Sequence, residues 1–255
     1  MKCILSIAGS DSCGGAGIQA DIKSAHYHGV YACTAITAVT AQNTTGVQGI
    51  VNLEPSFVVE QINSVLNDFK VDAIKIGMLS NHKIIDAVYE TLKDTNIPII
   101  LDPVAVSRSG FKLIDDDAVE SLKKLFDLAY VITPNYYETK LFFGVEKYSD
   151  IYDLEHSYEN ILFKNLAQES SWNNDVLLNK NKDIKEFKSV KVHSLNTHGT
   201  GCSFSSSLAS LIALGKSLDE AIELSKKYIH DAIEKSPDFG KGNGPINHIL
   251  NQATN

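Results

Sequence analysis

The stretch Asn196-Thr197-His198-Gly199-Thr200-Gly201-Cys202-Ser203 runs directly into the apolar segment 204–214, which is typical of a buried helix. Glycines at 199 and 201 let the backbone approach a ligand closely, and the first turn of a helix leaves its N–H groups unpaired. These donors and the positive end of the helix dipole form an anion site, called here the glycine nest (residues 199–202). The dipole also favours the thiolate form of Cys202. The stretch predicts a small-molecule kinase that stabilises developing negative charge at this nest.

Composition limits the other functions. The chain has 255 residues and a net charge of −8, which argues against a general nucleic-acid surface. Its four cysteines show no CxxC spacing and no clustered histidine partner, so a disulfide framework and a zinc site are both disfavoured and a reducing cytoplasm is expected. No apolar run approaches the ~20 residues of a membrane span, and residues 1–8 lack the features of a signal peptide.

The N-terminal part predicts a strand, a glycine loop, a helix and a second strand. Residues 3–8 form an apolar run, residues 9–17 are rich in glycine, residues 18–28 have helical spacing, and residues 30–40 are rich in β-branched side chains. Such a βαβ unit predicts an α/β fold with a mostly parallel sheet. The glycine loop is not a P-loop, because Gly15-Ala16 stands where Lys-Ser/Thr is required, and it has no GxGxxG motif.

The rest of the chain continues the alternation of strands and helices, with no internal repeat and no linker, so we expect a single domain over residues 1–255. Residues 41–46 and 104–113 are expected as loops, the latter a mobile one. The expected strands are 50–53, 73–77, 97–101, 130–133, 160–163 and a hairpin of 175–178 with 186–192. The expected helices are 55–68, a helix capped by Ser80 or Asn81 and ending near 93, 115–126, 135–143 closed by Gly144, 204–214, 218–233 and a short helix in the tail.

In open α/β sheets, ligands bind beyond the carboxyl ends of the strands. The polar loops expected at those ends would therefore share one crevice, which the glycine nest would complete. These loops contain residues 11–17, 42–45, Met78, Asp102 and 135–138.

Short motifs along the chain resemble one family. They are Gly9-Ser10-Asp11, Gly14-Gly15-Ala16-Gly17-Ile18-Gln19-Ala20-Asp21, Thr40-Ala41-Gln42-Asn43-Thr44, Lys75-Ile76-Gly77-Met78-Leu79, Asp102-Pro103-Val104, Thr133-Pro134-Asn135, the stretch 196–202 and Gly240-Lys241-Gly242. In this order they resemble the hydroxymethylpyrimidine and hydroxymethylpyrimidine-phosphate kinases of thiamine biosynthesis, in the ribokinase-like superfamily. The resemblance implies a three-layer α/β/α fold, ATP and Mg²⁺ as cofactors, and a homodimer.

The resemblance also implies catalytic roles for the nest. Gly199, Thr200 and Gly201 match an anion hole that stabilises the transferring phosphoryl group, the role already expected from the residues themselves. Cys202 matches the position of the catalytic base, where it would accept or polarise the hydroxymethyl proton. The alternative is that Cys202 is a small packed helix residue. His198 is expected to cap or pack rather than to act in catalysis.

For the acceptor pocket, the resemblance implies that Gln42 and Asp21 hydrogen-bond the pyrimidine. An amide offers both a donor and an acceptor to a heterocycle edge. Gly9 belongs to the same pocket, and Met78 and Val104 would wall the ring. Asp21 could instead be a solvated acid in the first turn of a helix, and both apolar side chains could belong to the core.

For the nucleotide side, the resemblance implies that Asn135 and Glu138 organise Mg²⁺ and phosphate, with a capped helix start as the alternative. Asp102 would hold the metal or a nucleotide phosphate, so Asp102 and Glu138 are the expected magnesium ligands. Lys164 and Lys241 would meet the nucleotide, although Lys241 could be a solvated tail residue. Arg108, in the loop, could reach the phosphates.

The chain departs from the family pattern between residues 145 and 166. The family has a full helix there and then a strand that ends Lys-Gly-Gly-His, whereas this chain keeps Lys164 and lacks the glycines and the histidine. A second departure, Ser12-Cys13, stands where proline and serine are common. Two other functions stay open: a pyridoxal or pyridoxine kinase, and a pyrimidine-binding protein without turnover. No nucleic acid or membrane is expected as a partner.

Overall fold

Within the residues that the computed structural model describes, namely 1–106, 114, 118–168 and 171–250, the chain forms a nine-stranded sheet. The strand order is β3-β2-β1-β4-β5-β6-β7-β8-β9. Pairing is parallel from β2 to β7 and antiparallel at both edges, where β3 joins β2 and the β8–β9 pair extends β7. The strands are β1 (Cys3–Asp11), β2 (Tyr31–Asn43), β3 (Gly46–Asn52), β4 (Ala73–Ile76), β5 (Ile99–Leu101), β6 (Val131–Ile132), β7 (Asn160–Gln168), β8 (Trp172–Asn179) and β9 (Ile184–Val190).

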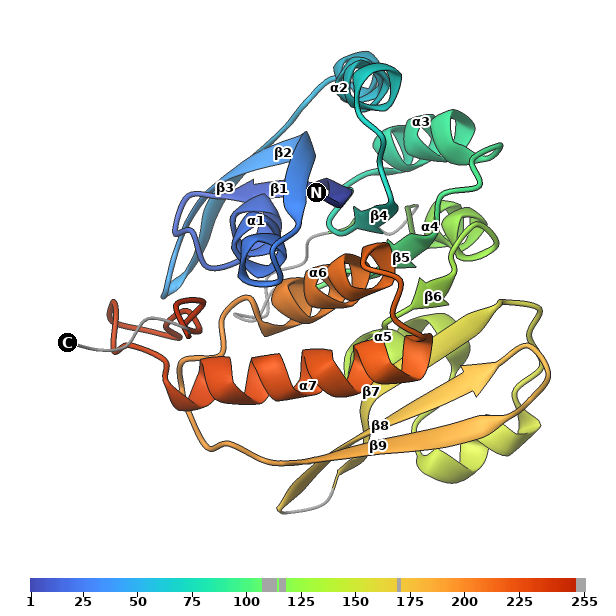
Figure 1. Cartoon of the computed structure of the whole chain (residues 1–255), viewed down its shortest axis with the longest axis vertical. Helices are drawn as coiled ribbons and strands as arrows, with labels where there is room; N and C mark the ends of the chain where they lie inside the picture. Colours follow the sequence, from blue (N-terminus) through green and yellow to red (C-terminus); the bar gives the residue numbers. More distant parts are fainter. Residues whose placement is uncertain (107–113, 115–117, 169–170, 251–255) are drawn as a thin grey trace.

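Helices cover both faces of this sheet, which gives three layers. Helices α1, α6 and α7 lie on one face, and α2, α3, α4 and α5 lie on the other (Figure 1). The helices are α1 (Gly17–Tyr27), α2 (Pro55–Asp68), α3 (His82–Leu92), α4 (Ala118–Phe126), α5 (Tyr136–Phe143), the 3-10 helix η1 (Tyr148–Asp153), α6 (Thr200–Ala213) and α7 (Leu218–Glu234).

The central strands are buried on both faces, as expected for parallel strands between two helical layers. Successive side chains of a strand point to opposite faces, so Ile4 packs in the core beneath α1, α6 and α7, whereas Leu5 packs in the core beneath α2 to α5. Both side chains are fully buried. The apolar run that predicted the first strand is therefore the centre of the three-layer fold.

Several predicted helix ends are confirmed. Pro55 is the first residue of α2, where its missing N–H is not needed. The side chain of Asn81 caps α3 by accepting a hydrogen bond from the N–H of Ile84 at 3.0 Å. Gly144 ends α5 in the left-handed region, at a φ of 67°.

Other predicted boundaries were wrong. The first strand continues through Asp11, and residues 42 and 43 lie in β2, because β2 and β3 form a tight antiparallel hairpin rather than a loop. The strand predicted at 160–163 runs to 168, since pairing with β8 prolongs it. Residues 245–250 form no helix, and the nest helix starts at 200 rather than 204. Residues 107–113 of the predicted loop, including Arg108, and 115–117 of the predicted helix lie outside the described residues.

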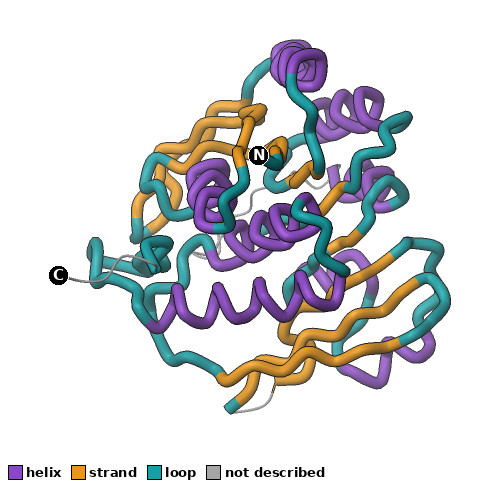
Figure 2. The backbone as a smooth tube through the Cα atoms, viewed as in Figure 1, coloured by secondary structure: helices purple, strands orange, loops and turns teal. Residues whose placement is uncertain are grey.

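The strand order changes direction at β1, because β2 lies on one side of it and β4 on the other. Such a point opens a crevice beyond the carboxyl ends of the strands. The antiparallel strands β8 and β9 lie at the opposite end of the sheet from β3 (Figure 2). Among the described residues, none of the helices is long and apolar enough to cross a membrane.

Candidate active site

A cavity of about 1470 Å³ lies at the carboxyl ends of the central strands. A single small ligand typically fills ~300–1,000 Å³, so this cavity has room for two substrates side by side. Most of the predicted site residues line it: Gly9, Gln42, Met78, Asp102, Val104, Asn135, Glu138, Lys164, Gly199, Thr200, Gly201 and Cys202.

The glycine nest lies at the start of α6. Gly199 is the N-cap of α6 and adopts a left-handed φ of 82°. The amides of the first helical turn have no partners within the helix, so those of Gly201 and Cys202 are available to a ligand. A Cβ built on Gly201 would lie 3.6 Å from Asp102 Oδ2 and 3.8 Å from Lys164 Nζ. The nest therefore faces a carboxylate and an ammonium group across the cavity.

The carboxylate and ammonium form a nearly buried ion pair. Lys164 Nζ lies 3.0 Å from Asp102 Oδ1, and Ser205 donates a hydrogen bond to Asp102 Oδ2 at 3.3 Å. Burial alone would lower the pKa of Lys164, but the charges of Asp102 and Glu138 raise it. Lys164 is therefore a fixed cation beside the nest, and it can hold a phosphate there.

Asn135 and Glu138 form a capping box at the start of α5. Asn135 Oδ1 accepts hydrogen bonds from the N–H groups of Tyr137 and Glu138, and Glu138 Oε2 accepts one from the N–H of Asn135 at 2.9 Å. Burial and the charge of Asp102 raise the pKa of Glu138 to about 7. The pair is thus both a helix cap and part of the cavity wall, and its acid lies near the Asp102 carboxylate.

The turn after Lys164 forms without the two glycines that the resembled family has at this place. Asn165 adopts a left-handed φ of 55°, which asparagine tolerates better than most residues. Its N–H donates to Asp175 Oδ1 at 2.7 Å, and Asp175 Oδ2 lies 2.5 Å from Lys226 Nζ on α7. Both charged side chains are buried and line the cavity, and sequence reasoning missed them.

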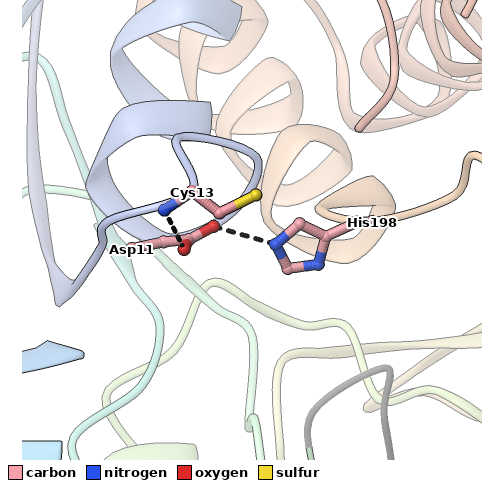
Figure 3. Close-up of side chains that lie close together, drawn as sticks. All are labelled: Asp11, Cys13 and His198. Atoms are coloured by element: carbon pink, nitrogen blue, oxygen red, sulfur yellow. Dashed lines mark hydrogen bonds and ion pairs between the residues drawn. The ribbon is translucent and has the colours of Figure 1, made fainter. Parts of the chain in front are cut away.

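Asp11 ties the first glycine loop to the glycine nest. Its carboxylate accepts hydrogen bonds from the N–H groups of Cys13, Gly15 and Ala16, and its Oδ2 lies 2.8 Å from His198 Nε2 (Figure 3). Burial alone would raise the pKa of Asp11, but the hydrogen bonds from His198 and from the N–H groups lower it. His198 is a packing residue, as expected, with Asp11 as a partner that the sequence did not reveal.

Gln42 reaches the same part of the cavity from β2. Its Nε2 lies 3.4 Å from His198 Nε2, and its Oε1 accepts a long hydrogen bond of 3.3 Å from Thr40. Both contacts are weak by the usual distance criteria. The carboxamide is therefore available to a ligand with a donor and an acceptor side by side.

The expectation that Cys202 favours the thiolate form was wrong. Burial raises the pKa of its thiol to about 11, and this effect outweighs the charge of Lys75 and the N–H of Gly17 that stabilise the anion. The half-buried thiol lines the cavity beside Gly199 and is protonated at rest.

Asp21 does not line the cavity, contrary to the expectation that it binds the pyrimidine. Its side chain is fully buried, with Lys75 Nζ at 2.9 Å and hydrogen bonds of 2.6 Å from both Ser6 and Ser206. Because Asp21 lies on the inward face of α1, it joins that helix to β4 and α6 beneath the nest. It is not a solvated acid either.

Lys241 also lies outside the cavity lining and is exposed. The glycines beside it serve a different contact, because a Cβ on Gly240 would lie 2.3 Å from Thr44 Oγ1, and one on Gly242 would lie 2.1 Å from Thr44 O. The N–H of Lys241 donates to the same Oγ1 at 3.1 Å. The glycines therefore let the tail pack on the β2–β3 hairpin.

Comparison with known proteins identifies the family of the chain. The model of the phosphomethylpyrimidine kinase family matches residues 11–247. The chain is 41% identical over 97% of its length to the thiamine biosynthesis bifunctional protein ThiED of Geobacter sulfurreducens, and it spans 52% of that relative. It is 37% identical to the hydroxymethylpyrimidine/phosphomethylpyrimidine kinase of Staphylococcus aureus, over 97% of this chain and 94% of that one.

The fold is also that of a solved vitamin kinase. The structure of Bacillus subtilis pyridoxal kinase in complex with ADP superposes with a TM-score of 0.86 at 28% identity, covering 98% of both chains. The ribokinase-like α/β/α architecture is thereby confirmed. With the family model covering most of its length, the chain belongs to the phosphomethylpyrimidine kinase family.

Proposed function

We propose that this chain transfers a phosphoryl group from ATP to the hydroxymethyl group of 4-amino-5-hydroxymethyl-2-methylpyrimidine, and then a second one to the resulting monophosphate. The observation that carries the proposal is the single cavity that joins the nest of Gly199–Cys202 to the available carboxamide of Gln42. A phosphoryl group held at the nest would face an alcohol at the Gln42 end. The name of the Staphylococcus aureus relative supports this choice of acceptor, and the name of the Geobacter sulfurreducens relative supports the thiamine pathway.

At the acceptor end, Gln42 would hydrogen-bond the ring, and Gly9, Met78 and Val104 would wall it. The hydroxymethyl group would then point at Cys202, whose thiol would first lose its own proton to solvent, and the resulting thiolate would accept the proton of the hydroxyl group. The N–H groups of the nest would stabilise the charge that develops on the transferring phosphoryl group. Such transfer is mostly positioning and charge stabilisation, so this arrangement supplies the main requirements.

Magnesium fits the donor set at the nucleotide end. Asp102 and Glu138 present neighbouring carboxylates, burial and the charge of Asp102 raise the pKa of Glu138, and Mg²⁺ prefers such oxygen ligands. Asp102 and Glu138 would hold the ion, which when bound neutralises phosphate charge. Asn135 would fix Glu138 through the capping box, and Lys164 would contact the phosphates from the other side.

Steady-state kinetics test the acceptor. Purified protein, Mg-ATP and a coupled ADP assay should give a kcat/KM for the pyrimidine alcohol at least ~10-fold above that for pyridoxal, a difference of about 1.4 kcal/mol in transition-state binding. A tenfold preference for pyridoxal would instead establish the pyridoxal kinase function. The similarity to the Bacillus subtilis enzyme is the reason to test this alternative. Ligand binding without turnover at saturating Mg-ATP would identify a binding protein.

We also propose that the chain works as a cytoplasmic homodimer. Val39 and Val51 are directly paired across β2 and β3, and their side chains are 47% and 68% exposed, which favours a covered apolar face at this edge. The four free cysteines are compatible with a reducing compartment. Sedimentation equilibrium should give twice the chain mass of 27.9 kDa.

A further inference from the structure

Three potential metal ligands converge where the first glycine loop meets the glycine nest. Asp11, Cys13 and His198 each offer one ligand atom, and these atoms lie within 4.8 Å of one another (Figure 3). Asp11 and His198 are buried, and Cys13 is half-buried. The histidine stands 187 residues after the aspartate, so the spacing argument that disfavoured a zinc site could not detect this group.

We propose that Asp11, Cys13 and His198 bind one thiophilic divalent cation such as Zn²⁺. Carboxylate oxygen, thiolate and imidazole nitrogen are the ligands that zinc uses in proteins, and three of them leave one of four positions for water. On loading, the metal replaces the thiol proton of Cys13, which passes to solvent, and the neutral ring of His198 carries its one proton on Nδ1 so that Nε2 can bind the ion.

The present geometry is close to what such an ion needs. Zinc bonds of ~2.0–2.1 Å to nitrogen and oxygen place two tetrahedral ligands roughly 3.3 Å apart. Asp11 Oδ2 and His198 Nε2 are now 2.8 Å apart, so a shift of about half an ångström would admit the ion.

The surroundings already hold the carboxylate in place for a metal. The N–H of Cys13 donates to Asp11 Oδ1 at 2.8 Å, and the N–H groups of Gly15 and Ala16 donate to Oδ2 at 3.0 and 2.8 Å. Partners of this kind orient ligands and strengthen metal binding. Asp11 thus needs no rearrangement of its own, and only the two side chains beside it move.

Metal binding would affect the proposed phosphoryl transfer, and this consequence rests on the proposed function. Asp11 and His198 line the cavity, and His198 is the neighbour of Gln42 at 3.4 Å. An ion on His198 would occupy the acceptor end of the cavity. Zn²⁺ should therefore inhibit by competing with the alcohol.

Cobalt provides the direct test, because Co²⁺ replaces Zn²⁺ and a cobalt–thiolate bond absorbs in the near ultraviolet. Titration of the whole wild-type chain should give this band at one Co²⁺ per chain, and Cys13→Ala should abolish it. Two controls should keep it: Cys33→Ala, a buried thiol on β2, and His230→Gln, in the partly exposed group His230, Asp231 and Glu234 on α7. An absent wild-type band, a band that survives Cys13→Ala, or a band lost in His230→Gln would overturn the site.

Turnover tests the consequence separately. Cys13 does not line the cavity, so Cys13→Ala should keep its basal rate at saturating Mg-ATP while its sensitivity to Zn²⁺ falls at least ~10-fold. Equal inhibition of both proteins would refute competition through this site. The cobalt titration requires no turnover, so failure of the proposed function would leave its result intact.

Discussion

At the scale of single residues, burial decides the state of Cys202. The start of a helix favours a thiolate, and the sequence suggested that state for this reason. In the structure the charge of Lys75 favours it as well. The fold adds what a sequence does not show: Cys202 lies above Asp21 and near Asp102, so burial and two carboxylates raise the pKa of the thiol to about 11. Cys202 is therefore an uncharged thiol at rest, and a role as catalytic base would require that it first lose its proton.

Replacement of Cys202 tests this role. If the thiolate accepts the hydroxyl proton, Cys202→Ala should lower kcat by roughly 10²–10⁴-fold and change KM little. In the wild type, kcat/KM should rise between pH 7 and 9, because the thiolate fraction grows as pH approaches the thiol pKa of about 11. This rise should disappear in Cys202→Ala. An unaltered kcat would remove Cys202 from the mechanism.

Asn165 is a residue whose backbone conformation matters more than its side chain. Its left-handed φ of 55° should make Asn165→Ala less stable by about 1 kcal/mol, whereas Asn165→Gly should be neutral. Because Lys164 precedes this turn, the alanine variant should also raise the KM for Mg-ATP. Urea unfolding and steady-state kinetics of the two variants measure both effects. An alanine variant as stable and as active as the glycine variant would contradict the assignment.

At the scale of elements, the site depends on two glycine loops that interlock. A Cβ on Gly199 would lie 1.7 Å from Gly15 O, and one on Gly15 would lie 2.4 Å from His198 Cδ2. Each loop therefore needs glycine because of the other. The sequence showed that both loops are rich in glycine, but a contact between segments so distant along the chain has no signature in local spacing.

Gly199→Ala should therefore lower the free energy of unfolding by much more than the cost of a strained backbone dihedral alone. Gly29 is a matched control: its φ is +72°, close to the +82° of Gly199, but nothing lies within 4 Å of its Cβ position. Gly29→Ala should lose only about 1–2 kcal/mol, the cost of the left-handed conformation, and keep its activity. Gly199→Ala should lose more stability and most of its kcat. Equal losses in the two variants would show that the interlock is unimportant.

Elements whose ends carry local signals were predictable. Pro55, Asn81 and Gly144 are such signals, and the structure confirms all three. The prediction was wrong where tertiary pairing decides a boundary. Residues 42 and 43 look like a polar loop but are strand, because β3 folds back on β2, and the turn at Asn165 depends on Asp175 in the neighbouring strand.

At the scale of the whole molecule, the candidate site was predictable where loops meet at strand ends and was not where charges pair across layers. The position of Asp102, Glu138 and Lys164 around one cavity follows from the topology of a parallel sheet. The pairing of Asp21 with Lys75 does not follow from the topology. In the sequence alone, Asp21 is compatible both with a substrate ligand and with a surface acid. Only the structure shows that Asp21 is buried in an ion pair with Lys75 of β4 and does not line the cavity.

A polar seam between helices α1, α6 and α7 makes the stability of the molecule sensitive to acid. His28 Nε2 lies 2.7 Å from Ser207 Oγ, which contacts Ser225, and the hydroxyl of Tyr228 lies 2.6 Å from His248 Nδ1. Burial lowers the pKa of both His28 and His248 to about 4. The folded chain thus keeps these two rings neutral where the unfolded chain, with a histidine pKa of ~6.5, protonates them.

Acid should lower the free energy of unfolding through these two rings. Between pH 6.5 and 4 the unfolded chain binds more protons, so the free energy of unfolding should fall as pH decreases through this window and should be unaffected by these rings above it. Each ring contributes at most ~3 kcal/mol, and less because it is partly exposed. Urea unfolding at pH 7.5, 6 and 5 should show the loss in wild type and in His26→Gln, an exposed neighbour on α1. The double variant His28→Gln/His248→Gln should lose less stability over the same range, and an unchanged slope would show that the seam does not titrate with unfolding.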